Sequence, residues 1–137
     1  MILYDTIHTG GQMFDINLYS NIPIYQQIID EYKKLVVKGI LKNNDKIPSI
    51  RELALMLSIN PSTVSKAYAQ LEREGLIKTS RGRGTFISDE KFDEDVLLHE
   101  IKDQLTIPIK NAISFNIEEG KIIDIVKSIY KENNNEV

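Results

Sequence analysis

Short polar and basic side chains recur along one side of the segment that begins at Pro61. Their spacing of three and four residues matches one face of an α-helix, and no acid interrupts them before Glu72. The stripe comprises Ser62, Ser65, Lys66, Ala69 and Arg73, with Thr63 flanking it. A helix with small side chains at its front and cations behind can approach the DNA major groove closely and contact phosphates. The stripe therefore predicts binding of double-stranded DNA.

Arginine and glycine alternate a few residues further on, at Arg81, Gly82, Arg83 and Gly84. Residues 76–79 and 85–88 on either side have the character of short strands, which predicts a β-hairpin with a basic tip, or wing. The glycines allow close approach of the backbone, and the arginines suit phosphates or a narrow minor groove. A P-loop is not indicated, because the Gly-Lys-Ser/Thr ending is missing and a strand follows.

Two short helices are predicted to hold the stripe in place. Ser49 and Glu52 fit a capping box for the first, whose apolar residues are Ile50, Leu53, Ala54 and Leu57. Asn60 is a favoured N-cap for the second, which is expected to bury Val64, Ala67, Tyr68 and Leu71. For Tyr68 a phosphate contact is the alternative. Arg51 lies near a helix N-terminus, where the dipole favours an acid, so a role other than helix stability is expected for it.

A longer helix is predicted to begin at 21–23 and to end near Gly39. Its apolar face consists of Tyr25, Ile28, Ile29, Tyr32, Leu35 and Val36. This face should cover the two shorter helices and complete a three-helix core. Residues 14–17 alternate and predict a short strand, whereas residues 41–48 are expected to form a connecting loop.

The stretch PSIRELALMLSINPSTVSKAYAQLEREGLIKTSRGRGTFIS, residues 48–88, closely resembles the winged helix-turn-helix of the GntR family of bacterial transcription regulators. With only a short helical tail behind it, the chain is similar to the YtrA subfamily. The resemblance has strong motifs from about residue 15 to residue 88, and beyond that rests on length and helical character. It implies a mainly α fold, an α+β winged helix-turn-helix followed by a two-helix dimerisation segment.

The resemblance implies DNA contacts for nine residues of this chain. These are Arg51, Ser62, Thr63, Ser65, Lys66, Arg81, Gly82, Arg83 and Gly84. Residues 62–66 would face the major groove and the wing would meet the minor groove, while Arg51 would bind phosphate or enter the groove. Asn43-Asn44 replaces the Pro-Gly that is usual in the family, and Ser58 replaces a common glycine. Ser65 stands where some relatives carry a base-reading arginine, so the base preference is left open.

Charge is distributed unevenly along the chain. Residues 1–88 carry 11 Lys and Arg against 8 Asp and Glu, whereas residues 89–137 carry 6 against 12. The acid-rich segment 89–95 is expected to stabilise the start of a helix through its dipole. A basic front with an acidic rear can present one face to a polyanion, which offsets the overall charge of −3.

Other classes of function find little support in the residues. The chain has no cysteine, which excludes disulfides and thiolate metal sites, and neither His8 nor His99 has a second ligand nearby. No grouping of nucleophile and base is visible, so we expect no enzyme activity and no cofactor or metal. An apolar run of ~18 residues and a signal peptide are both missing, which predicts a soluble, cytoplasmic protein that does not enter the membrane.

Residues 89–137 are predicted to form two amphipathic helices. Their apolar stripes contain Leu97, Ile101 and Leu105 in the first helix, and Ile122, Ile125, Val126 and Ile129 in the second. Pro108 should kink the first, and Asn116 with Glu119 predicts the N-cap of the second. Two such helices cannot bury both stripes alone, so a partner subunit should cover them. The alternative is that they fold back on the winged domain.

These observations divide the chain into three parts: an N-terminal extension (1–12), a winged helix-turn-helix (13–88) and a helical dimerisation tail (89–137). Met13 is a candidate for the natural start. We predict a homodimeric, sequence-specific regulator, a repressor that binds an inverted repeat at its own or a neighbouring promoter, such as that of an ABC transporter operon. The alternative is an architectural or plasmid-maintenance DNA-binding protein with low specificity. A small-molecule effector is left open.

Overall fold

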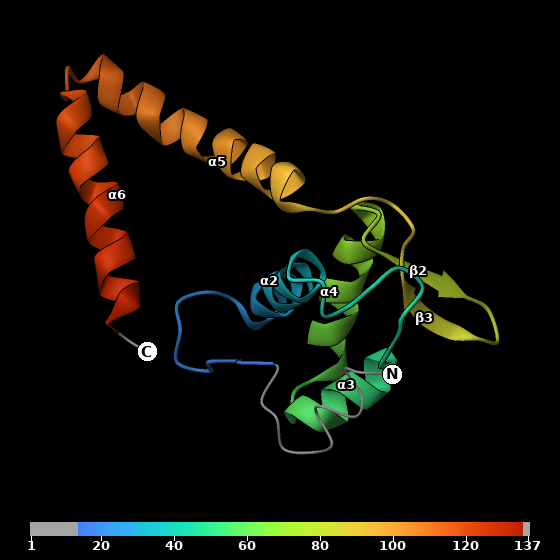
Figure 1. Ribbon diagram of the computed structural model, residues 1–137. Helices are drawn as coiled ribbons and strands as arrows, with labels where there is room; N and C mark the ends of the chain where they lie inside the picture. The colour runs from blue at the N-terminus through green and yellow to red at the C-terminus, as the bar shows by residue number, and fades with distance from the viewer. Residues whose placement is uncertain (1–13, 136–137) are drawn as a thin grey trace. The chain divides into compact units, whose positions relative to one another are not determined.

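The computed structural model describes residues 14–135, and the chain divides into two compact units, the first ending at Asp93 and the second beginning at Glu94. Figure 1 shows the elements of each unit. The predicted extension over 1–12 and the hypothesis about Met13 lie outside the described residues. Within the described residues, no helix combines the length and the apolar character that crossing a membrane requires.

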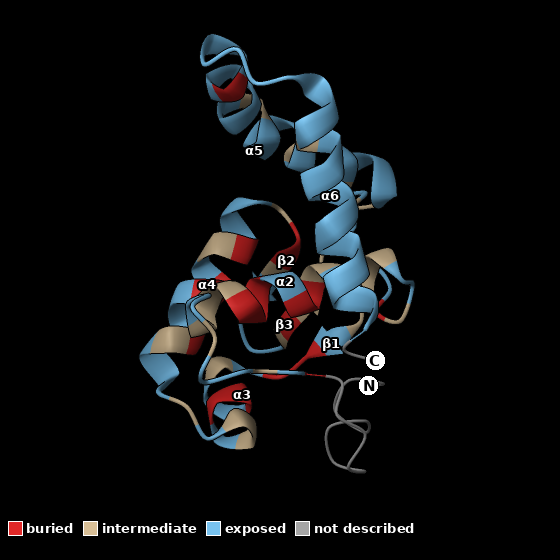
Figure 2. Cartoon of the chain, turned by 90° about the vertical axis from the view of Figure 1, so that its left-hand side faces the viewer, coloured by how far each residue is buried: buried red, intermediate tan, exposed pale blue. Residues whose placement is uncertain are grey.

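Three helices form the core of the first unit: α2 (Ile24–Val37), α3 (Ile50–Leu57) and α4 (Pro61–Arg73). Helix α4 packs against both of the others, because each helix turns its apolar stripe inward and removes it from water. The buried residues cluster where the three helices meet (Figure 2). They include Ile28, Ile29, Tyr32, Leu35, Leu53, Ala54, Val64, Ala67, Tyr68 and Leu71. The predicted three-helix core is confirmed.

The predicted caps of α3 and α4 are also confirmed. Ser49 Oγ accepts a hydrogen bond from the Glu52 N–H at 3.1 Å, and Glu52 Oε2 accepts one from the Ser49 N–H at 3.3 Å. Asn60 Oδ1 accepts a hydrogen bond from the Ser62 N–H at 2.9 Å, and Pro61 is the first residue of α4. The start of α4 is therefore specified locally by side chains that satisfy its free N–H groups.

Residues with positive φ make the turns of this unit. Gly75 follows α4 with φ 78°, and Ser58 follows α3 with φ 53°. Asn44 has φ 67° in the loop where the family usually has Pro-Gly. Asparagine tolerates this left-handed conformation better than most residues, so the turn survives the departure from the family sequence.

A three-stranded antiparallel sheet completes the unit, in the order β1 (Lys46–Ile47), β3 (Gly84–Ile87), β2 (Ile77–Ser80). The predicted hairpin is present, with each strand shifted by about one residue. The prediction of a connecting loop over residues 41–48 is wrong at its end, because Lys46 pairs with Phe86 and Ile47 with Thr85. A two-residue strand carries too little alternation to be visible in sequence; its pairing depends on β3.

The short strand predicted over residues 14–17 does not form. Phe14 instead packs edge-on against Tyr32, with ring centroids 5.0 Å apart. Gln27, which is 9% exposed, holds the following turn through Nε2 hydrogen bonds to the Asn17 and Ile22 carbonyls at 3.0 and 2.8 Å. These side-chain bonds take up the backbone groups of Asn17, at the end of the alternating segment, that a neighbouring strand would otherwise pair with.

A buried pair of tyrosines links α2, α4 and the residue before the α3 cap. The Tyr68 hydroxyl donates to the Pro48 carbonyl oxygen at 2.7 Å, and the Tyr32 and Tyr68 oxygens are 2.6 Å apart. Since the single Tyr68 hydroxyl proton is used on Pro48, Tyr32 is the donor to Tyr68. Tyr68 is 4% exposed, so the alternative in which it reaches a phosphate is wrong.

We expect Tyr68→Phe to lower the free energy of unfolding by about 1–3 kcal/mol, because it leaves both the Pro48 carbonyl and the Tyr32 hydroxyl buried without a partner. Tyr32→Phe keeps the Tyr68–Pro48 bond and should cost less, about 0.5–1.5 kcal/mol. Urea denaturation of the two variants and the wild type measures both values. Equal costs would contradict the assigned direction of the hydrogen bonds.

The second unit consists of α5 (Glu94–Ser114) and α6 (Glu119–Asn134). Helix α5 continues through Pro108. The predicted N-cap at Asn116 is wrong: Asn116 has φ 56° and terminates α5, with its N–H bonded to the Ile113 carbonyl at 3.0 Å, while Glu118 is the N-cap residue of α6. The ability of asparagine to adopt a left-handed conformation therefore outweighs its capping preference here.

Candidate DNA-binding surface

The outer face of α4 presents the polar stripe that the sequence predicted. Ser62, Ser65 and Lys66 are exposed, and Thr63 is half-buried beside them. The Ser62 hydroxyl donates to Asn60 Oδ1 at 2.9 Å, so in this geometry Ser62 offers a partner only its oxygen as an acceptor. Ser65 lies about one turn of the helix after Ser62, and its hydroxyl does not bond to the cap residue Asn60.

Arg51 lies close to the start of α4 although it belongs to α3. Its side chain is exposed and borders a hollow of about 260 Å³. The other residues around this hollow are Ala54, Leu55, Ser58, Ile59 and Pro61. The turn at Ser58 thus brings Arg51 beside the N-terminus of α4. Since the N-termini of both helices disfavour a cation, helix stability does not account for an arginine at this position.

The wing carries its arginines at the tip of the hairpin. Arg81, Gly82 and Arg83 are exposed, and the turn is closed by a hydrogen bond from the Arg83 N–H to the Ser80 carbonyl at 3.0 Å. Gly82 has φ 81°, a conformation that side chains other than glycine rarely adopt. The wing shape therefore depends on glycine at this position.

Lys46 is an additional cation at the wing that the sequence prediction missed. Strand β1 places it opposite Phe86, and a Cβ added at Gly84 would lie 3.0 Å from Lys46 Cε. The side chain is exposed. Its charge was visible in the sequence, but its position was not, because it depends on the unpredicted pairing of β1 with β3.

The cations of this surface have no carboxylate partner among the described residues, in contrast to some of the other lysines of the unit. Lys34 and Lys78 form ion pairs with Glu31 and Asp89. Within residues 14–135, the exposed cations Arg51, Lys66, Arg81 and Arg83 form no ion pair with an acid. Their positive charge is therefore uncompensated by neighbouring acids and available to a polyanion.

An ion pair fixes the far end of α4 to α2. Lys33 Nζ lies 2.9 Å from Glu74 Oε2. Burial alone would raise the pKa of Glu74, but hydrogen bonds from Lys33 and Gln70 and the charges of Lys33 and Arg73 outweigh it, so that the pKa falls below its ordinary value. The carboxylate is thus ionised at neutral pH and holds α4 against α2.

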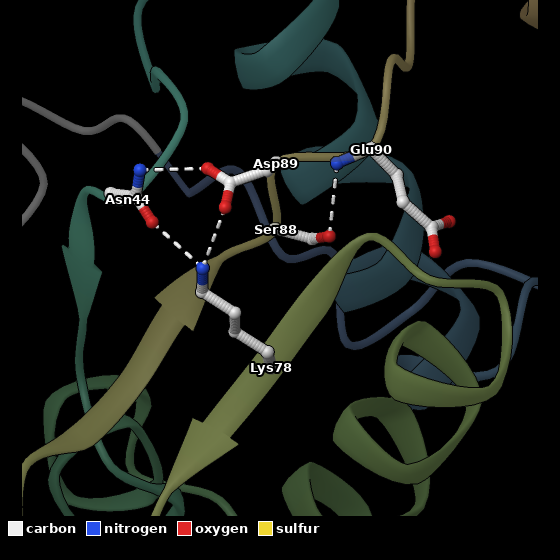
Figure 3. Close-up of polar contacts among 5 residues, drawn as sticks. All are labelled: Asn44, Lys78, Ser88, Asp89 and Glu90. Atoms are coloured by element: carbon white, nitrogen blue, oxygen red, sulfur yellow. Dashed lines mark hydrogen bonds and ion pairs between the residues drawn. The ribbon is translucent and has the colours of Figure 1, made fainter.

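Asp89 closes a small polar cluster at the base of the wing (Figure 3). Lys78 Nζ donates to Asn44 Oδ1 at 2.7 Å and to Asp89 Oδ2 at 3.1 Å, and Asn44 Nδ2 donates to Asp89 Oδ1 at 2.7 Å. The prediction that acids 89–95 serve a helix start holds only for Glu94 and Asp95, which lie in the first turn of α5. Asp89 instead ties the chain leaving β3 to the loop before β1.

Comparison with known proteins agrees with this geometry. A family model described as bacterial regulatory proteins, gntR family, matches residues 24–87. The HTH-type transcriptional repressor YtrA of Bacillus subtilis (strain 168) is 47% identical over 119 residues, which cover 85% of this chain and 92% of that protein. The chain belongs to the GntR family. Within this family of transcription regulators it is of the YtrA type.

Solved structures of similar proteins share the fold. A transcriptional antiterminator from Listeria monocytogenes EGD-e has 39% identity and a TM-score of 0.65, with 85% of this chain and 89% of that chain covered. YtrA from Sulfolobus acidocaldarius, a GntR-family transcription factor, has 38% identity and a TM-score of 0.53, with 88% and 98% covered. The predicted class, mainly α with a winged helix-turn-helix, is confirmed.

The residues predicted for dimerisation divide into two groups in the second unit. Ile122 and Val126 line a hollow of about 580 Å³ between α6 and α5. Ile125 and Ile129 do not line it and are 55% and 51% exposed. On α5, Ile101 and Leu105 border a second hollow together with Leu98, whereas Leu97 is half-buried and does not border it.

Proposed function

We propose that this GntR-family regulator is a homodimeric repressor that binds an inverted-repeat operator at its own or a neighbouring promoter, such as that of an ABC transporter operon. The observation that supports this most directly is the set of unpaired cations on α4, the start of α3 and the wing. Together with the exposed hydroxyls of α4, they match phosphate and groove contacts. Regulators of this kind act in the cytoplasm, where we place it.

The second unit supports a dimer because it leaves most of its apolar residues uncovered. Helix α6 buries none of its residues, and α5 buries only Ala112; both helices are almost entirely pale blue in Figure 2. An uncovered apolar patch of this extent is unusual on a soluble monomer and favours an interface. A two-fold dimer would present two α4 helices to half-sites about one turn of DNA apart.

Footprinting on the upstream region of the gene tests the function. We expect protection of two symmetric half-sites and an affinity well above that for random DNA of equal length, measured at several salt concentrations. Equal affinities with the same salt slope would instead favour an architectural protein of low specificity. No binding to either DNA would contradict both functions.

Lys66→Ala and Arg83→Ala should each weaken operator binding by about 1–3 kcal/mol where the residue contacts a base, and reduce the salt slope by about 1 where it contacts a phosphate. Fluorescence anisotropy at two salt concentrations measures both quantities. Lys38→Ala removes one exposed charge just beyond the last residue of α2 and serves as the matched control. Unchanged affinity in either test variant would remove that residue from the surface.

A further inference from the structure

Lys66, the cation in the middle of the α4 stripe, rests on an aromatic ring. Its Nζ lies 4.0 Å from the centroid of the Tyr25 ring, well inside the ~6 Å range of a cation–π interaction. Tyr25 belongs to the first turn of α2 and is half-buried against the core. A helix outside the helix-turn-helix thus contacts a side chain of its outer face.

The type of contact determines what Lys66 can still do. A carboxylate partner would neutralise the ammonium group, as Glu31 does for Lys34 at 2.9 Å. A tyrosine ring carries no net charge, so it restrains the ammonium and leaves its positive charge and its outward N–H groups available to a phosphate. Within the described residues, the Tyr25 ring is the only partner of the Lys66 ammonium.

The contact also limits the freedom of a flexible side chain. Lysine has a flexible four-carbon stem, and ordering it on binding costs rotamer entropy. The Tyr25 ring, which packs on the core, already restricts the Lys66 side chain in the free protein. Less entropy is then lost when DNA binds, so preorganisation favours binding. Tyr25 itself is held in place because the rest of α2 packs on α4.

We propose that Tyr25 is a positioning residue that holds Lys66 in place for contact with the DNA backbone. This inference rests on the proposed DNA-binding function. It extends the functional surface to α2 and assigns Tyr25 a role in recognition besides its packing in the core.

A double-mutant cycle on the operator tests the proposal with the full-length protein. Tyr25→Leu should weaken binding by about two- to tenfold, and should have no further effect in a protein that already carries Lys66→Ala. Tyr25→Phe keeps the ring and should stay within about twofold of the wild type. A purely structural role for Tyr25 would give the same loss of affinity with and without Lys66. Tighter binding by Tyr25→Leu would mean that the ring keeps Lys66 away from the DNA. Either result overturns the proposal.

A second series avoids variants that fail to fold. Phenylalanine analogues with increasing fluorination at position 25 keep the ring shape while they weaken its attraction for cations. Operator affinity should fall stepwise with fluorination when Lys66 is present and stay constant in Lys66→Ala. A flat series with Lys66 present overturns the proposal, whereas a wild-type protein that does not select its operator would overturn the proposed function itself.

Discussion

Replacing Ile125 and Ile129 together with aspartate is expected to lower operator affinity by about 10²–10⁴-fold. A dimer makes the second half-site contact intramolecular, and loss of that linkage removes a gain of this size. These two isoleucines are suitable because they do not line the hollow between α5 and α6. The aspartates should therefore block the interface without disturbing the packing of the two helices on each other.

Sedimentation velocity of the same variant should show a monomer at concentrations where the wild type is a dimer. Lys131→Asp changes the net charge by the same amount, and its position, six residues after Ile125, is away from the apolar stripe, so it should remain dimeric and bind normally. If the double variant stays dimeric, or if the wild type is itself monomeric while bound to two half-sites, the interface on α6 is wrongly assigned.

Stability is expected to fall steeply in alkali because of the buried tyrosine pair. Burial raises the pKa of the Tyr32 and Tyr68 hydroxyls well above the ordinary value of 10.0. Below that pH both states keep the two protons, so the pair introduces no pH dependence. Above it the unfolded chain releases both protons while the folded protein keeps them, so the free energy of unfolding should drop by about 2.7 kcal/mol per pH unit.

Urea denaturation between neutral pH and strongly alkaline pH measures this slope. Tyr32→Phe and Tyr68→Phe should each remove one titrating group and halve the slope, to about 1.4 kcal/mol per pH unit. Tyr19→Phe, at a position that is 96% exposed, serves as the control for loss of a tyrosine hydroxyl outside the pair. A slope that persists in the double Tyr32/Tyr68 variant would mean that other groups cause the alkaline instability.

Local chemistry was sufficient to predict most of the first unit. The capping box at Ser49 and Glu52, the Asn60-Pro61 start of α4 and the glycine at its end involve residues within a few positions of one another. The predicted DNA-contact residues of α4 lie on its outer face because helical periodicity alone decides which side of an amphipathic helix is exposed. Their contacts with DNA remain a prediction.

The structure differs from the sequence prediction where two local preferences compete, or where a residue distant in sequence decides the conformation. Asn116 can cap a following helix or terminate a preceding one, and the sequence was interpreted as the first whereas α5 ends there. Residues 14–17 alternate like a strand, but Phe14 packs on Tyr32 and Asn17 bonds to Gln27, both residues of α2, and no sheet forms there. In each case the residue that settles the conformation lies outside the predicted motif: Ile113 for the cap, and Gln27 and Tyr32 for the strand.

The sequence by itself determined the helix-turn-helix, the basic wing and the family, because caps, periodicity and turn residues act over a few positions along the chain. Only the tertiary structure decided that β1 brings Lys46 to the wing, that the Tyr68 hydroxyl donates a hydrogen bond to the Pro48 carbonyl and that the Tyr25 ring contacts Lys66. These pairs are 20 to 41 residues apart in sequence, and such contacts arise only when the packing of the helices and the sheet brings distant side chains together.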